Sequence, residues 1–137
     1  MICGLNGASA EVCKNLVLAG ISVTIQDSAR VTAADLGAQF FLSAEDIGKN
    51  RAAAALSRVR ELNAFATVKS VEESLGAVSD EVIAEHNVVV VAAGMPVEQA
   101  RLNKEGLDLD GRPTTAKVWD GLGALLQLGK LKKLRCA

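Results

Sequence analysis

Hydrophobic and polar positions along the chain follow two periods, one typical of helices and one typical of strands. Apolar residues recur at intervals of three and four over residues 10–19 and 49–63, which predicts two helices with one apolar face each. Gly20 stands where a glycine would end the first of these helices. Short runs rich in β-branched or apolar residues predict strands at 1–3, 21–26, 66–71 and 87–93.

The second half of the chain continues this alternation. The run at 88–91 consists of four valines and predicts a strand buried on both faces of a parallel sheet. Because crossovers between parallel strands are right-handed, the expected fold is α/β and Rossmann-like, with three layers and a mostly parallel sheet. The crevice of such a sheet lies at the carboxyl ends of its strands. Weaker patterns predict a helical crossover at 72–85, a helix at 97–107, and strands at 114–119 and 124–128.

Composition fits one domain over residues 1–137 with an aliphatic core, since half of the chain is apolar and only 3% is aromatic. The net charge of −1 gives no reason to expect nucleic acid or an anionic membrane as a partner. No apolar run reaches the ~18 residues needed to span a bilayer. The tail at 130–137 is basic, and we expect it to be frayed. Three cysteines without a C-x-x-C pair indicate free thiols in a reducing compartment.

A glycine turn between the first strand and the first helix is the candidate ligand site. Such a turn directs free backbone N–H groups and the positive end of a helix dipole at a phosphate. Gly4 and Gly7 are placed for it, and Asp27, which follows the second strand, stands where a ribose-binding acid belongs. The spacing departs from G-x-G-x-x-G, because Asn6 and Ser9 replace two glycines. A nucleotide site and a purely structural turn both remain open.

The polar residues near this turn also have two interpretations each. Asp27 is either a ribose acid or a cap at the end of a strand. Lys49, Asn50 and Arg51 are either directed at a phosphate or solvated at the start of a helix.

The other polar and aromatic residues singled out have simpler expectations. Gln39 and Phe40 are expected in a dimer interface or in the core. The arginines of the second helix, which include Arg58 and Arg60, are expected on a solvated face, and the single histidine, His86, on the surface.

Five segments in order carry a family resemblance, which covers roughly residues 1–123 and is specific at 27–63. The sequence closely resembles the adenylation domains of ubiquitin-activating and ubiquitin-like-modifier-activating enzymes, of the ThiF-like superfamily. The segments are GASAEVCKNLVLAG at 7–20, VTIQD at 23–27, DLGAQFFL at 35–42, EDIGKNRA at 45–52 and RELN at 60–63.

The resemblance implies that two adenylation halves pair, in one chain or as two subunits. The active half binds ATP and magnesium and adenylates the C-terminal glycine of ubiquitin or a related modifier. A cysteine on a separate domain then takes the modifier as a thioester. The implied location is the cytoplasm, the nucleus or both.

The resemblance also implies that this chain is the non-catalytic half. The family's phosphate-contacting arginine falls at Ala38, its lysine falls at Arg51, and its magnesium-binding aspartate falls at 93–94, where no carboxylate stands. We therefore expect no catalytic residue and no metal ligand here, with ATP and magnesium in the partner half. The expected vestigial nucleotide site consists of Gly4, Gly7, Asp27, Lys49 and Arg51. The expected partner interface consists of Gln39, Phe40 and Phe41.

The family's inactive half has a segment before its first strand, whereas this chain begins almost on the glycine turn. We expect an N-terminally truncated domain from a longer protein, without the thioester-cysteine domain. Two alternatives stay open. One is an NAD- or FAD-binding Rossmann oxidoreductase domain, supported by Gly4, Gly7 and Asp27. The other is a homodimeric, bacterial-type adenylating enzyme of sulfur-carrier proteins, which would adenylate without a second kind of half.

Overall fold

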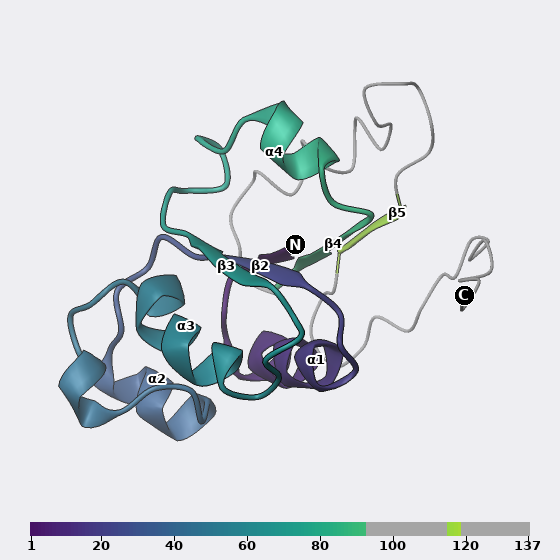
Figure 1. The fold of residues 1–137 in the computed structure, drawn as a ribbon. Helices are drawn as coiled ribbons and strands as arrows, with labels where there is room; N and C mark the ends of the chain where they lie inside the picture. Colours follow the sequence, from purple (N-terminus) through teal and green to yellow (C-terminus); the bar gives the residue numbers. More distant parts are fainter. Residues whose placement is uncertain (93–114, 119–137) are drawn as a thin grey trace.

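A computed structural model describes residues 1–92 and 115–118 of the chain, and its centre is a five-stranded parallel sheet (Figure 1). The strand order is β3-β2-β1-β4-β5, so the order reverses between β1 and β4. This arrangement confirms the expected α/β, Rossmann-like fold. The strands are β1 (Ile2–Cys3), β2 (Val23–Gln26), β3 (Val68–Val71), β4 (Val88–Val91) and β5 (Thr115–Val118). The helix expected at 97–107, the strand at 124–128 and the tail at 130–137 lie outside the described residues.

Helices cover both faces of the sheet, as Figure 1 shows. Helices α1, α2 and α3 lie below the sheet in that view, and α4 lies above it. The bounds are α1 (Gly7–Leu18), α2 (Ala33–Ala38), α3 (Arg51–Arg60) and α4 (Asp80–Ala84), with a 3₁₀ turn at Ala44–Asp46. The carboxyl ends of β1 and β2 lead directly into the glycine turn and Asp27.

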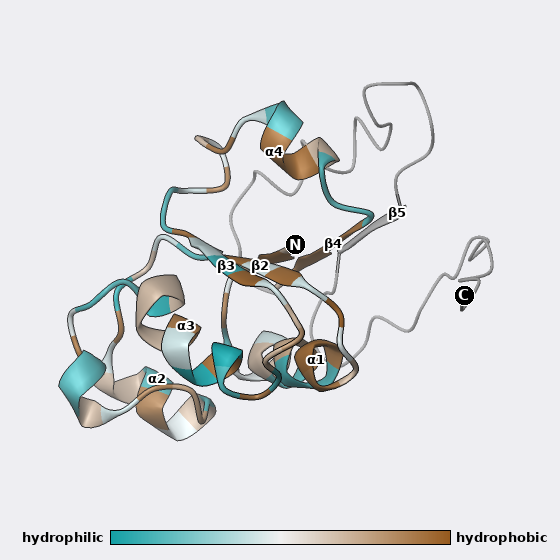
Figure 2. Ribbon diagram, in the orientation of Figure 1, coloured by the Kyte–Doolittle hydropathy of each residue, from teal (hydrophilic) through white to brown (hydrophobic). Residues whose placement is uncertain are grey.

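The core is aliphatic and consists of two clusters, one on each side of the sheet. Ile2 belongs to the larger cluster with residues of α1 and α3, whereas its neighbour Cys3 belongs to the cluster beneath α4. This division follows from the alternation of side chains along a strand. Figure 2 shows the hydrophobic colour concentrated on the strands. Val88 is 52% exposed, so the prediction that the valine run is buried on both faces is wrong at its first residue.

Side-chain caps set the helix ends, and they account for the differences from the predicted bounds. The first helix begins at Gly7 because the Asn6 carboxamide oxygen accepts from the Ser9 N–H at 3.0 Å. The second begins at Arg51 because the side chain of Asn50 accepts from Ala53 N–H at 3.0 Å. Gly20 has φ +82° and ends α1 as expected.

Helix α2 was not expected from periodicity, because it is short and none of its residues is buried. Its signal is the capping box formed by Thr32 and Asp35, each of whose side chains bonds the other's backbone.

His86 is not the free surface residue that the sequence indicates. Its Nδ1 lies 2.8 Å from the carbonyl oxygen of Val82 and its Nε2 lies 2.7 Å from Oγ1 of Thr24, a buried residue of β2. Because a carbonyl only accepts, Nδ1 carries the proton, and Nε2 accepts from the threonine hydroxyl. Burial lowers the pKa of His86, with a smaller contribution from the nearby α-amino group. The neutral imidazole therefore ties the end of α4 to the sheet.

This pKa shift makes folding stability depend on pH. A histidine whose pKa is lowered in the folded state binds protons more readily in the unfolded state, so acid favours unfolding. We expect the free energy of unfolding to fall as the pH drops below about 6.5. The variant His86→Gln should lose less stability over the same interval. Urea unfolding of both proteins between pH 8 and 5.5 measures this, and equal slopes would contradict it.

Candidate functional site

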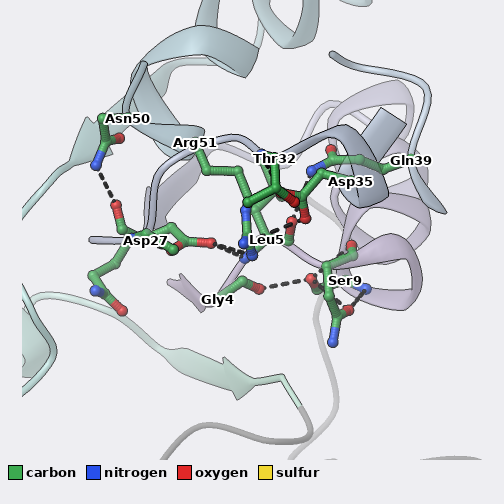
Figure 3. A network of polar contacts seen from close by, with 12 residues as sticks. Gly4, Leu5, Ser9, Asp27, Thr32, Asp35, Gln39, Asn50 and Arg51 are labelled. Atoms are coloured by element: carbon green, nitrogen blue, oxygen red, sulfur yellow. Dashed lines mark hydrogen bonds and ion pairs between the residues drawn. The ribbon is translucent and has the colours of Figure 1, made fainter. Parts of the chain in front are cut away.

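The glycine turn is closed by hydrogen bonds from its own chain. Gly4 has φ +79°, which favours glycine, and its N–H donates to the carbonyl of Gln26 at 2.7 Å. Its own carbonyl accepts from Oγ of Ser9 at 2.6 Å. The next N–H, that of Leu5, donates to Oδ2 of Asp27 at 2.7 Å (Figure 3). The turn is thus fixed to the end of β2 and to the first turn of α1.

Gly7 is needed for close packing between two helices. A Cβ atom at Gly7 would overlap the carbonyl oxygen of Ala38, the last residue of α2. The residue after Ala38 is Gln39, which is 5% exposed. Its Nε2 donates to the carbonyl of Leu5 at 2.8 Å. The end of α2 therefore lies against the glycine turn and the start of α1. In this structure the carbonyl oxygen of Ala38 takes the space that a side chain on Gly7 would need.

Asp27 is a buried acceptor that joins three segments. It is 4% exposed, and its carboxylate accepts from Leu5 N–H at 2.7 Å and from Ala29 N–H at 2.8 Å. Its backbone carbonyl accepts from Nδ2 of Asn50 at 2.8 Å. Of the two interpretations, the structure shows the strand-end cap. Ribose binding by Asp27 stays a prediction.

Arg51 joins two carboxylates, and we call this arrangement the Arg51 bridge: Arg51 with Asp27 and Asp35. Nη1 lies 3.2 Å from Oδ2 of Asp27, and Nη2 lies 3.3 Å from Oδ1 of Asp35 (Figure 3). Burial raises the pKa of Asp35, but hydrogen bonds from Thr32 and the Arg51 charge outweigh it and hold that pKa below its ordinary value. Arg51 is thus paired within this chain and largely shielded from water, and its contact with a phosphate stays a prediction.

A second set of charges, the Asp46 cluster, consists of Asp46, Ser43, Lys49 and Arg58. The carboxylate of Asp46 accepts from Ser43 N–H at 3.0 Å, from Lys49 Nζ at 3.0 Å and from Arg58 Nη1 at 2.6 Å. These hydrogen bonds hold the pKa of Asp46 far below its ordinary value. Arg58 also donates to the carbonyl of Phe41 at 2.8 Å. Lys49 therefore stabilises the turn before α3.

The arginines of α3 lie off its buried stripe as periodicity indicates, and Arg60 is exposed, whereas Arg51 is largely shielded from water. Arg51 and Arg58 form the ion pairs described above, and Arg60 donates from Nε to the carbonyl of Val68 at 3.0 Å. Apolar periodicity identifies the buried stripe of a helix, but it does not distinguish a paired charge from a hydrated one.

The three residues expected at a partner interface separate into two groups. Gln39 and Phe41 are 5% and 3% exposed, so both are buried within this chain. Phe40 is 51% exposed, with Nζ of Lys14 placed 5.1 Å from its ring centroid. The interface prediction therefore remains a prediction for Phe40 alone.

Other kinds of site find little support in residues 1–92 and 115–118. This part of the chain contains no group of three His, Cys, Asp or Glu side chains that could hold a metal ion. It also contains no helix long and apolar enough to cross a membrane. Cys3 and Cys13 are free and buried, and burial raises the pKa of their thiols to about 12 and about 11. Neither is a reactive thiolate near neutral pH.

A parallel sheet with a glycine turn at its topological switch point is typical of the class of Rossmann-like α/β domains. Within that class, a model of the ThiF family matches residues 1–97, and the chain belongs to the ThiF family. It is 36% identical over 94 residues to SUMO-activating enzyme subunit 1 of Xenopus laevis. It is 35% identical over 105 residues to ubiquitin-like modifier-activating enzyme 1 of Rattus norvegicus. It is 50% identical over 64 residues to ubiquitin-activating enzyme E1 1 of Triticum aestivum.

These matches cover 68%, 76% and 46% of this chain but only 27%, 10% and 6% of the three relatives. The resemblance to modifier-activating enzymes is thereby confirmed at the level of the adenylation domain. The chain corresponds to a small part of each relative.

The Gly7 contact generates a prediction about folding stability. We expect Gly7→Ala to lower the free energy of unfolding by about 1–3 kcal/mol, because the methyl group forces α2 away from the glycine turn. The matched control is Gly37→Ala, since a Cβ there meets nothing within 4 Å and Gly37 lies inside a helix. The control should be neutral or stabilising by about 0.5–1 kcal/mol. Urea denaturation checks both, and equal effects would refute the close-packing role.

The Asp46 cluster generates a second prediction. Replacing Asp46 by Asn removes the charge that pairs with Arg58 and should cost about 1–3 kcal/mol of folding stability. Glu45→Gln removes the same charge one residue earlier, from an exposed side chain, and should change stability by less than about 0.5 kcal/mol. Thermal and urea unfolding of the two variants measure the difference. If Glu45→Gln lowered the free energy of unfolding as much as Asp46→Asn does, the loss of a negative charge alone would explain the effect, and the contacts of the cluster would not.

Proposed function

We propose that this chain is the non-catalytic adenylation half of a ubiquitin or ubiquitin-like modifier-activating enzyme. In this proposal it pairs with a catalytic half, in the same chain or in a separate subunit, which adenylates the modifier. Family membership and the names of the relatives support the modifier-activating part. Assignment to the non-catalytic half depends on the chemistry at the glycine turn.

The single observation that carries this assignment is that the chain's own groups bond the carboxylate of Asp27 and lie against Gly7. The carboxylate of Asp27 accepts from two backbone N–H groups and from Arg51. The carbonyl of Ala38 fills the space beside Gly7. A nucleotide would compete with these contacts at the turn.

Charge at the turn supports the same assignment. Attack on an α-phosphate needs cationic groups that stabilise the developing negative charge, and losing one such group typically costs about 3–4 kcal/mol of barrier. Family resemblance places such a cation at Ala38, whose side chain carries no charge. The nearest cations, Arg51 and Lys49, are already paired with carboxylates. The residues present therefore do not fit ATP with magnesium, and we assign both to the partner half.

Phe40 is the residue that we assign to contact with the catalytic half. It is half exposed beside the glycine turn, and large aromatic side chains are enriched at the energetic centres of interfaces. Modifier-activating chemistry also implies ubiquitin or a related protein as the modifier, and the cytoplasm or nucleus as the location.

The second candidate function is an NAD- or FAD-binding oxidoreductase domain. Its support is the glycine turn followed by an acid after β2, which dinucleotide-binding domains share. Membership of the ThiF family favours adenylation chemistry instead. Hydride transfer by the purified chain with NAD would reverse this preference.

The test is pyrophosphate exchange by the chain alone and together with a catalytic ThiF-family half from the same organism. We expect no exchange by the chain alone, and modifier-dependent exchange when the two are mixed. Phe40→Asp should weaken the pairing at least about tenfold, because it places a charge in an apolar contact. The matched control is Phe65→Asp, which changes a phenylalanine that is 96% exposed and should leave the pairing unchanged.

Exchange by the chain alone would show an active, self-sufficient adenylating enzyme and would refute the proposal. Equal pairing by the Phe40→Asp and Phe65→Asp proteins would refute the assignment of Phe40 to the interface.

A further inference from the structure

We propose that the Arg51 bridge is an internal contact that closes the glycine turn to nucleotides, with the arginine side chain bound where a ribose would otherwise bind. This inference rests on the proposed function, because that function makes the turn the remnant of a nucleotide site. It goes further, because it assigns the exclusion of ATP to one side chain.

The bridge joins three separate elements at the carboxyl end of the sheet. Asp27 follows β2, Asp35 belongs to α2, and Arg51 is the first residue of α3. The two terminal nitrogens of Arg51 each pair with one carboxylate, at 3.2 Å and 3.3 Å. Figure 3 shows the guanidinium group between the two acids and beside Leu5 of the glycine turn. A single side chain thus holds α2 and α3 against the turn.

The bridge is largely shielded from water. The side chains of Arg51, Asp27 and Asp35 are 18%, 5% and 15% exposed. Charges that are partly buried interact more strongly and are screened less by salt than charges on the surface. The Nε atom of Arg51 is buried and has no hydrogen-bond partner within the part of the chain that the structure describes. The position of the guanidinium group is therefore set by its two carboxylates, against the cost of one unsatisfied donor.

Arg51 bonds one carboxylate oxygen of Asp27 at the place where a ribose would bind. Oδ2 accepts from Leu5 N–H and Arg51, whereas Oδ1 accepts from Ala29 N–H. Because Asp27 is only 4% exposed, ribose hydroxyls would compete with Arg51 for this carboxylate. Two carboxylates and one guanidinium group also leave one net negative charge beside the turn, which opposes the phosphates of a nucleotide.

The test compares ATP binding by three variants and the unchanged protein. Arg51→Lys keeps the positive charge, but a compact ammonium group does not span two carboxylates as a planar guanidinium group does. Asp35→Asn removes one of the two anchors of Arg51 and the net negative charge of the bridge. The matched control is Arg58→Lys, which alters an arginine of the same helix that pairs with the buried Asp46.

Equilibrium dialysis with labelled ATP, and with AMP in a parallel series, measures the binding. We expect no saturation by the unchanged chain or by Arg58→Lys at millimolar ATP. Arg51→Lys should bind ATP at least about tenfold more tightly than the unchanged chain, since one charge-assisted hydrogen bond to Asp27 is released. Asp35→Asn should show a gain of about threefold or more. Because the released contact lies at the ribose, AMP should show the same order of variants.

Hydrogen exchange gives a readout that does not depend on a nucleotide. In Arg51→Lys the N–H groups of Leu5 and Ala29 should exchange faster, whereas Arg58→Lys should leave them protected. If Arg51→Lys does not fold, Asp35→Asn tests the inference by ATP dialysis and by hydrogen exchange.

Saturable micromolar ATP binding by the unchanged chain would overturn the inference. So would folded Arg51→Lys and Asp35→Asn proteins that bind ATP no better than Arg58→Lys. Neither result would affect the proposed function, which is measured separately by exchange with the catalytic half. Conversely, the dialysis result stands even if no partner restores pyrophosphate exchange.

Discussion

The buried carboxylate of Asp27 is the constraint on which the arrangement of this domain depends. A carboxylate removed from water must be paired and hydrogen-bonded, or its burial would cost several kcal/mol. Its partners come from the glycine turn, from the loop after β2 and from the start of α3. Satisfying one side chain therefore fixes three loops at the carboxyl end of the sheet. The helices that follow these loops take their positions from it.

The Asp46 cluster extends the same principle to the segment between α2 and α3. Arg58 reaches back from α3 to Asp46 and to the carbonyl of Phe41, so the turn before the helix is tied to the helix itself. In the sequence, Asp46 of this cluster and Arg51 of the Arg51 bridge are only a few residues apart. Together they tie the segments on both sides of α2 to α3, although none of the residues of α2 is buried. Here polar contacts hold neighbouring segments together, as apolar packing holds the helices beneath the sheet.

Local patterns predicted the fold and the strands well, because the valine run and the two apolar stripes reflect burial that each element experiences on its own. The glycine at Gly20 was predictable for the same reason. The partners of Arg51, Arg58 and His86 were not, because each lies in an element distant in sequence. Periodicity shows which side of a helix is apolar, but an ion pair depends on tertiary placement. The sequence therefore predicted that the glycine turn and Asp27 lie at the carboxyl end of the sheet, whereas the internal contacts of these residues were missed, and their binding of a nucleotide stays a prediction.

The residues of the site make internal contacts, and in the proposed function these contacts take the place of catalytic ones. In the proposed function, the single charge of Arg51 is shared between two carboxylates, which weakens its attraction for a phosphate, and Asp27 already accepts from three donors. In that function, residues of these types at the glycine turn bond one another, which would keep the shape of the domain without a bound nucleotide. Such a domain would offer its partner a surface that does not depend on nucleotide binding, as the supporting half of a two-part enzyme requires.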